Sequence, residues 1–81
     1  MSPEDLLREC LVARASGLDF PTTWRSIIRI HPLVAGPAVQ KAEAGRTWLE
    51  VPLMTGHRIK HDDANGYTLI PPCESLAAAS Q

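Results

Sequence analysis

The sequence is poor in aromatic residues and has no long hydrophobic run. Its aromatic side chains are Phe20, Trp24, Trp48 and Tyr67. A core must therefore be built mostly from Leu, Ile, Val and Ala. No apolar stretch approaches the ~20 residues that a membrane-spanning helix requires, so we expect no membrane partner. An apolar fraction of 44% in 81 residues still suffices for one compact domain, which we place at residues 1–72.

Cysteine is also scarce, since only Cys10 and Cys73 are present. The N-terminus shows neither the basic region nor the hydrophobic segment of a secretory signal. We therefore predict a cytoplasmic protein in which both thiols are reduced. Cys10 falls on the apolar side of a predicted helix, as a small core residue does. Cys73 belongs to residues 73–81, which we predict to be a flexible C-terminal tail.

Motifs that would indicate a reaction or a cofactor are missing. The glycines are single and widely spaced, which is typical of turns, and no phosphate-binding loop is present. Cys, His and Asp occur at no spacing that indicates a catalytic triad. His57 and His61 lie in a segment that we expect to be a strand, where four residues span about 13 Å, too far for one metal ion. We therefore predict a non-enzymatic protein with no metal and no cofactor.

The net charge of −1 gives no overall signal for nucleic acid, but the charges are unevenly distributed. Residues 25–61 carry six basic residues against two acidic ones, a net charge of +4, and all three histidines. Both flanking segments are acidic. The middle of the chain is therefore a candidate basic region, although its charges could equally be scattered and solvated.

The first third of the chain predicts two helices. Ser2 is a typical N-cap, Pro3 suits the first helical position, and Asp5 completes a variant capping box. This helix should end near Ala15, before Gly17. A second amphipathic helix is expected over residues 20–31, and its apolar face is Trp24, Ile27, Ile28 and His31.

The pattern changes to short strands after residue 33. We expect strands at residues 47–53, 57–61 and 67–70, with Asn65-Gly66 in the last hairpin turn. Together these elements predict an α+β fold, with two N-terminal helices packed on a small antiparallel β-meander. The predicted core is Leu6, Leu7, Leu11, Phe20, Trp24, Ile27, Ile28, Leu49, Val51, Leu53, Ile59 and Leu69.

Residues 37–44 are compatible with two structures. Pro37 at the start and Gly45 at the end suit a two-turn helix, but the same residues could be a strand that enters a turn at residues 43–46. A strand fits the meander. A helix would give a winged-helix-like fold, in which the hairpin at residues 57–70 is the wing.

Trp48 is the most informative candidate for a binding residue. Strand alternation places it opposite Leu49, Val51 and Leu53. If that face is exposed, Trp48 with Arg46, Arg58 and Lys60 would bind an unknown protein partner. If a helix or the tail covers it, Trp48 is a core residue. The alternative function is nucleic-acid binding through the basic segment 25–61, with Lys41, Arg58 and Lys60 near the phosphates.

Overall fold

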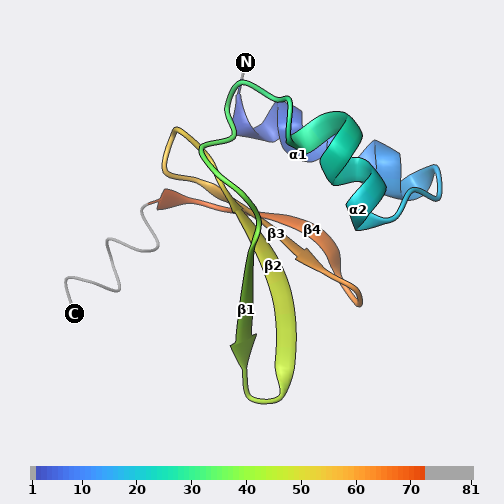
Figure 1. Cartoon of the computed structure of the whole chain (residues 1–81), viewed down its shortest axis with the longest axis vertical. Coiled ribbons are helices and arrows are strands. Elements are labelled where there is room, and N and C mark those ends of the chain that lie inside the picture. Colours follow the sequence, from blue (N-terminus) through green and yellow to red (C-terminus); the bar gives the residue numbers. More distant parts are fainter. Residues whose placement is uncertain (1, 73–81) are drawn as a thin grey trace.

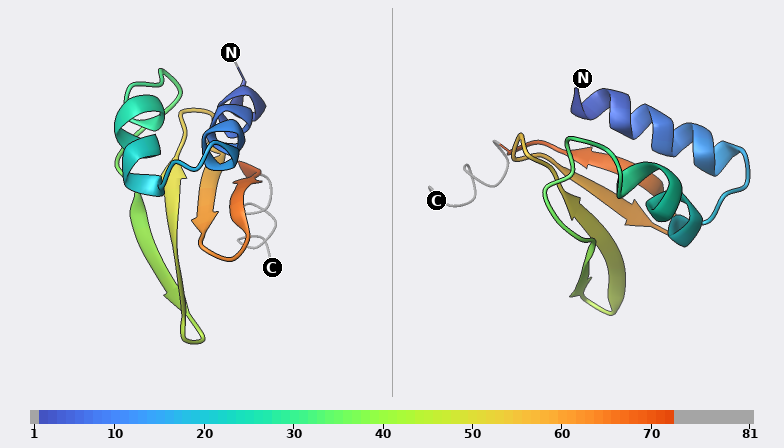
Figure 2. Two further views of the ribbon diagram at one scale, coloured as in Figure 1. Left: turned by 90° about the vertical axis from the view of Figure 1, so that its right-hand side faces the viewer. Right: turned by 45° about the horizontal axis from the view of Figure 1, so that its top comes forward.

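The computed structural model describes residues 2–72 and shows an α+β fold (Figure 1). Helices come first and a four-stranded antiparallel sheet follows, in the order β1-β2-β3-β4. The elements are α1 (Pro3–Ala15), α2 (Phe20–Thr23), the π-helix η1 (Trp24–Ile28), β1 (Val39–Glu43), β2 (Arg46–Pro52), β3 (Arg58–Asp62) and β4 (Gly66–Ile70). The helices lie on one face of the sheet (Figure 2), which confirms the predicted helices on a meander. The tail predicted at residues 73–81 lies outside the described residues.

The helix α1 begins and ends where the sequence indicates. The Ser2 hydroxyl accepts a hydrogen bond from the Asp5 N–H at 3.3 Å, and the Asp5 carboxylate accepts one from the Ser2 N–H at 3.1 Å. This reciprocal capping box satisfies two N–H groups that the helix itself leaves unpaired. At the other end, Gly17 has a φ of +88°, which glycine adopts at low cost.

The second helix departs from the predicted regular α-helix. After α2 it widens into η1, where the N–H of Arg29 donates to the carbonyl of Trp24, five residues earlier, at 2.8 Å. The hydroxyls of Thr23 and Ser26 donate to carbonyl oxygens four residues earlier, at 2.9 and 2.7 Å. Such bonds compete with the backbone ladder and distort a helix. The helix ends at Ile28, three residues before the predicted end.

The hydrophobic core fills the space between the helices and the sheet. Its buried members are Leu6, Cys10, Ile28, Val51, Leu53, Ile59 and Tyr67. Partly buried side chains pack around them, among them Leu7, Phe20, Trp24, Ile27 and Leu69.

Two predicted core residues are wrong. Leu11 is 44% exposed, because the buried face of α1 is formed by Leu6, Cys10 and Ala13, and Leu11 points away from it. Leu49 is half-buried and does not belong to the buried core or to the side chains that pack against it.

The hairpin of β1 and β2 projects beyond the helices as an arm (Figures 1 and 2). Ala44 and Gly45 form its two-residue turn with φ values of 52° and 78°. This turn reverses the chain, so that β2 runs antiparallel beside β1. All five residues of β1 are exposed. Since residues 39–43 are a strand, the strand interpretation is confirmed and the helix at 37–44, with its winged-helix-like fold, is wrong.

None of the helices within residues 2–72 combines the length and the hydrophobicity that a membrane-crossing helix needs.

Candidate functional site

The candidate binding residues from the sequence gather on the face of the sheet that points away from the helices. In the strand register Lys41 lies opposite Trp48, and Glu50 lies opposite Lys60. Alternation then places one set of side chains together, which we call the open face: Lys41, Glu43, Arg46, Trp48, Glu50, Arg58, Lys60 and Asp62. Within residues 2–72, the helices pack on the opposite face (Figure 2). The residues predicted for protein binding and those predicted for nucleic-acid binding therefore lie on the same surface of the sheet.

Trp48 is held in place by its neighbours on the open face. Its indole N–H donates to a carboxylate oxygen of Glu50 at 2.7 Å, and the ammonium of Lys60 lies 4.8 Å from the ring centroid. The side chain is half-buried, although no helix in residues 2–72 covers it. Its burial thus comes from the adjacent strands, and part of the ring remains open to solvent.

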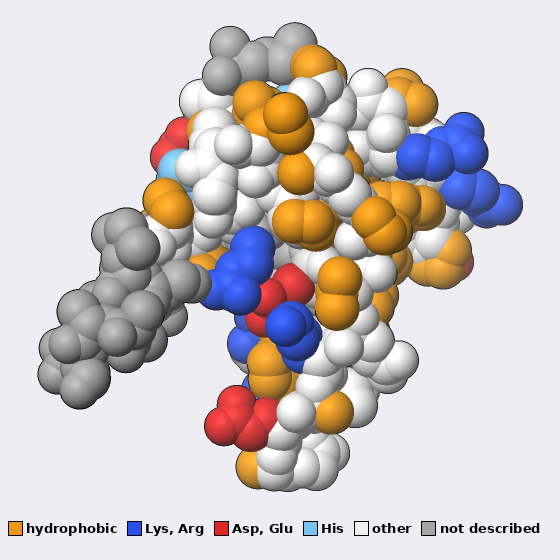
Figure 3. All heavy atoms as spheres, turned by 60° about the vertical axis from the view of Figure 1, so that its left-hand side comes forward, with side chains coloured by type: hydrophobic (Ala, Val, Ile, Leu, Met, Phe, Trp, Pro, Cys, Tyr) orange, Lys and Arg blue, Asp and Glu red, His pale blue; other side chains and the backbone are white. Residues whose placement is uncertain are grey.

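Buried carboxylates separate the basic residues of the open face. Arg58 contacts Glu50 at 3.0 Å and Arg46 contacts Asp62 at 3.2 Å, while Glu50 and Asp62 are only 7% and 8% exposed. The N–H of Ala64, and then Arg46, hold the pKa of Asp62 below its usual range. Figure 3 shows basic and acidic side chains side by side where the arm joins the body. The face is therefore mixed in charge rather than uniformly basic.

One hollow, of about 210 Å³, lies beside Trp48 near the tip of the arm and is also lined by Arg46 and Lys60. A second hollow, of about 280 Å³, is lined mainly by Gln40, Thr47, Leu49 and His61, whose side chains lie on the opposite face of the sheet. A partner side chain that enters the first hollow would lie beside Trp48.

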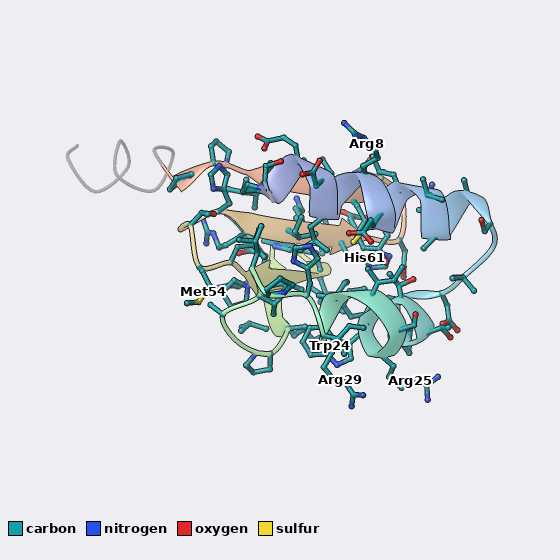
Figure 4. All side chains as sticks on the ribbon, turned by 90° about the horizontal axis from the view of Figure 1, so that it is seen from above. Arg8, Trp24, Arg25, Arg29, Met54 and His61 are labelled. Carbon is teal, nitrogen blue, oxygen red and sulfur yellow. The ribbon has the colours of Figure 1, made fainter. Side chains whose placement is uncertain are left out.

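The basic segment 25–61 does not form one patch. Arg25 in η1 and Arg29, directly after it, project outward on the helix side of the molecule (Figure 4). Lys41, Arg58 and Lys60 lie on the opposite face of the sheet. The net charge of the segment is thus divided between two surfaces.

The histidines have structural contacts. The ring of His61 packs on Phe20 and Tyr67, with centroids 4.9 and 4.8 Å apart, and burial lowers the pKa of His61. The ring of His31 accepts a hydrogen bond from the N–H of Leu33 at 3.2 Å. His57 contacts the Thr55 hydroxyl at 2.7 Å. Within residues 2–72, no group of three or more His, Cys, Asp or Glu could hold a metal ion.

A third hollow lies on the helix side. It has a volume of about 400 Å³ and is lined mainly by apolar side chains, among them Val12, Leu18 and Ile27. Sequence reasoning did not identify it, because Val12 and Leu18 were assigned no role and Ile27 was placed in the core. Arg8, Glu9 and Ser16 also line this hollow.

Glu50 and Asp62 are the members of the open face that sequence reasoning did not select. The alternation of residues 47–53 already places Glu50 beside Trp48. Asp62 was assigned to a turn, so its contact with Arg46 became visible only when the strand register was known.

Comparison with known proteins gives no relative from which a function could be inferred. No protein-family model, curated protein or solved structure matches this chain. The function must therefore be argued from the site itself.

Proposed function

We propose that the protein is a non-enzymatic binding module that recognises a protein partner through the open face. The observation that carries this proposal is the position of Trp48, fixed between Glu50 and Lys60 on a face that no described helix covers. The proposed location is the cytoplasm, a reducing compartment in which the free thiol of Cys10 persists.

A tryptophan whose side chain is already restricted in the free protein is suited to anchor a binding partner. Tryptophan is enriched among the residues that dominate protein interfaces, because its rigid ring buries a large area at low entropic cost. The hydrogen bond to Glu50 and the contact with Lys60 already restrict the indole in the free protein. A partner that covers Trp48 therefore loses less free energy in ordering it.

The charge pattern favours a protein over a nucleic acid. Phosphate binding depends on an excess of cations that displace counterions from the polymer. Here Glu50 and Asp62 are buried among the cations and contact Arg58 and Arg46. A surface of alternating signs is complementary to another surface of alternating signs, as protein interfaces commonly are.

The test compares proteins captured by the immobilised full chain with those captured by Trp48→Ala. The matched control is Met54→Ala, which removes a 70% exposed hydrophobic side chain at the distant end of the sheet (Figure 4). We expect one partner to be captured by wild type and Met54→Ala but lost with Trp48→Ala. Calorimetry with that purified partner should show an affinity loss of about 30-fold, which corresponds to about 2 kcal/mol.

Equal capture by the Trp48→Ala chain would contradict the proposal, provided that its amide NMR spectrum is still that of a folded protein. Titration with a mixed-sequence DNA duplex tests the alternative. Salt-sensitive shifts confined to Lys41, Arg58, Lys60 and their neighbours would replace the protein partner with a nucleic acid.

A further inference from the structure

The strand β1 is a free edge of the sheet. It is first in the strand order, all five of its residues are exposed, and it lies on the arm, away from the helices (Figures 1 and 2). The other edge, β4, has α1 packed along it and is followed by Pro71 and Pro72. The accessible edge of this sheet is therefore β1.

The hairpin geometry shows which backbone groups of β1 point outward. In a hairpin with a two-residue turn, the pair that flanks the turn is hydrogen-bonded, and hydrogen-bonded pairs then alternate along the strands. Glu43 and Arg46 flank the turn, and Lys41 and Trp48 form the next bonded pair. The N–H and C=O groups of Gln40 and Ala42 consequently point away from β2, toward the open edge.

Two features that commonly prevent pairing at a sheet edge are absent from β1. Residues 39–43 contain no proline and pair with β2 without a bulge. The side chains of Gln40 and Ala42 are uncharged, and those of Lys41 and Glu43 carry opposite charges on the open face. Among residues 2–72, neither Lys41 nor Glu43 has an ion-pair partner.

We propose that β1 is a self-association edge, along which a second copy of the chain pairs antiparallel with its own β1, centred on Ala42. In this register the outward backbone groups of Ala42 bond to those of Ala42 in the second copy. Each Lys41 lies opposite Glu43 of the second copy, so two ion pairs form across the two-fold axis.

The other two-fold registers are less favourable. A pairing centred on Lys41 places two ammonium groups opposite each other, and one centred on Glu43 does the same with two carboxylates. A pairing centred on Gln40 places Lys41 opposite Val39, so it forms no ion pair across the axis. The register centred on Ala42 is thus selected by charge complementarity.

The pairing produces a continuous eight-stranded sheet from two four-stranded ones. Because the two-fold axis is perpendicular to the sheet, both open faces lie on the same side. The contact itself uses β1, so it does not depend on a partner bound at Trp48.

Charge-reversal variants at Lys41 and Glu43 test the proposed self-association. The mass of the full-length wild-type chain is measured by sedimentation from about 10 μM to about 1 mM, a range that detects weak association. We expect the average mass to rise toward twice that of the monomer. Lys41→Glu and Glu43→Lys should each weaken association by at least about 10-fold, because each opposes like charges. The double variant Lys41→Glu/Glu43→Lys restores opposite charges and should associate like the wild type.

Amide exchange measured by NMR locates the contact. The amide of Ala42 should gain protection as the concentration rises, whereas the amide of Lys41, already bonded to β2, should not. A monomeric mass throughout, single variants that associate like the wild type, or a double variant that fails to recover would each overturn the proposal. Trp48→Ala should still associate, which separates this proposal from the proposed function.

Discussion

At the scale of single residues, Ile28 and Ile30 show how one stretch divides between core and surface. Ile28 is 0% exposed between the helices and the sheet, whereas Ile30, two residues later, is 68% exposed. Residues two positions apart in a helical turn point in nearly opposite directions, so the two isoleucines have opposite environments despite their similar sequence context.

We therefore expect Ile28→Ala to destabilise the protein by about 2–5 kcal/mol, since it removes buried methyl groups and leaves a cavity. Ile30→Ala is the matched control and should change the free energy of unfolding by less than about 0.5 kcal/mol. Urea denaturation of both variants measures the difference. A loss below about 1 kcal/mol for Ile28→Ala would show that the second helix is not central to the core.

Cys10 illustrates a residue whose role sequence reasoning identified correctly. It is fully buried on α1, and burial raises the pKa of its thiol to about 12. Since the thiolate is the reactive form, Cys10 is unsuited to nucleophilic chemistry at neutral pH and acts as a small core side chain.

At the scale of elements, the turn of the arm holds a strained residue. Ala44 is the only non-glycine residue with positive φ in the described chain, at 52°. A side chain in this left-handed region costs about 1 kcal/mol, whereas Asn followed by Gly is the preferred pair for such a turn.

Ala44→Asn should therefore stabilise the arm by about 0.5–1 kcal/mol, which corresponds to about 2- to 5-fold slower opening. The amide exchange rates of Val39, Lys41 and Glu43, whose N–H groups point toward β2, measure this effect at a concentration where the chain is monomeric. Gly45→Ala is the opposite control, because Gly45 has a φ of +78°, and it should speed exchange in the same residues. Unchanged rates in both variants would mean that the turn does not limit opening.

The elements also show what the sequence could and could not predict. Caps, prolines and the Asn65-Gly66 turn are local signals, so α1 and the last hairpin were predicted closely. The π-helix was not predictable from apolar spacing, because it depends on where hydroxyls such as that of Thr23 bond to the backbone. Residues 37–44 stayed ambiguous because their propensities suit both structures, and pairing with β2 decides between them.

At the scale of the whole molecule, the candidate site depends on long-range register. The turn predicted at residues 43–46 would place Lys41 opposite Trp48, but only if residues 37–44 are a strand. The division of the basic segment between two surfaces could not be predicted at all, since it requires knowing which face the helices cover. Local patterns thus gave the correct face for Trp48 and Glu50 but did not place Asp62 beside them.

The stability of the whole molecule should depend on pH through His61. Burial against the aromatic rings lowers the pKa of His61 and outweighs the nearby carboxylates of Asp63 and Asp62, which act in the opposite direction, while Arg14 lowers the pKa further. The unfolded chain therefore binds more protons than the folded one just below the ordinary histidine pKa of 6.5. Stability should be present above this pH and decrease as the pH falls through it.

Thermal unfolding at about pH 7.5 and about pH 5.5 tests this dependence, in a range above the titration of most carboxyl groups. The wild type should unfold at a lower temperature at the acidic pH. In His61→Gln, which cannot be protonated, the difference should shrink. An equal difference in both chains would assign the pH dependence to other groups.

The exposure of β1 has a consequence for how the protein unfolds. Because the arm buries no side chain on β1, its outer residues can separate from β2 without exposing the core. We therefore expect two cooperative units: an arm that opens locally at a low free-energy cost, and a body that exchanges its amides only on global unfolding. Binding of another molecule along the arm would then be coupled to the local folding of the arm.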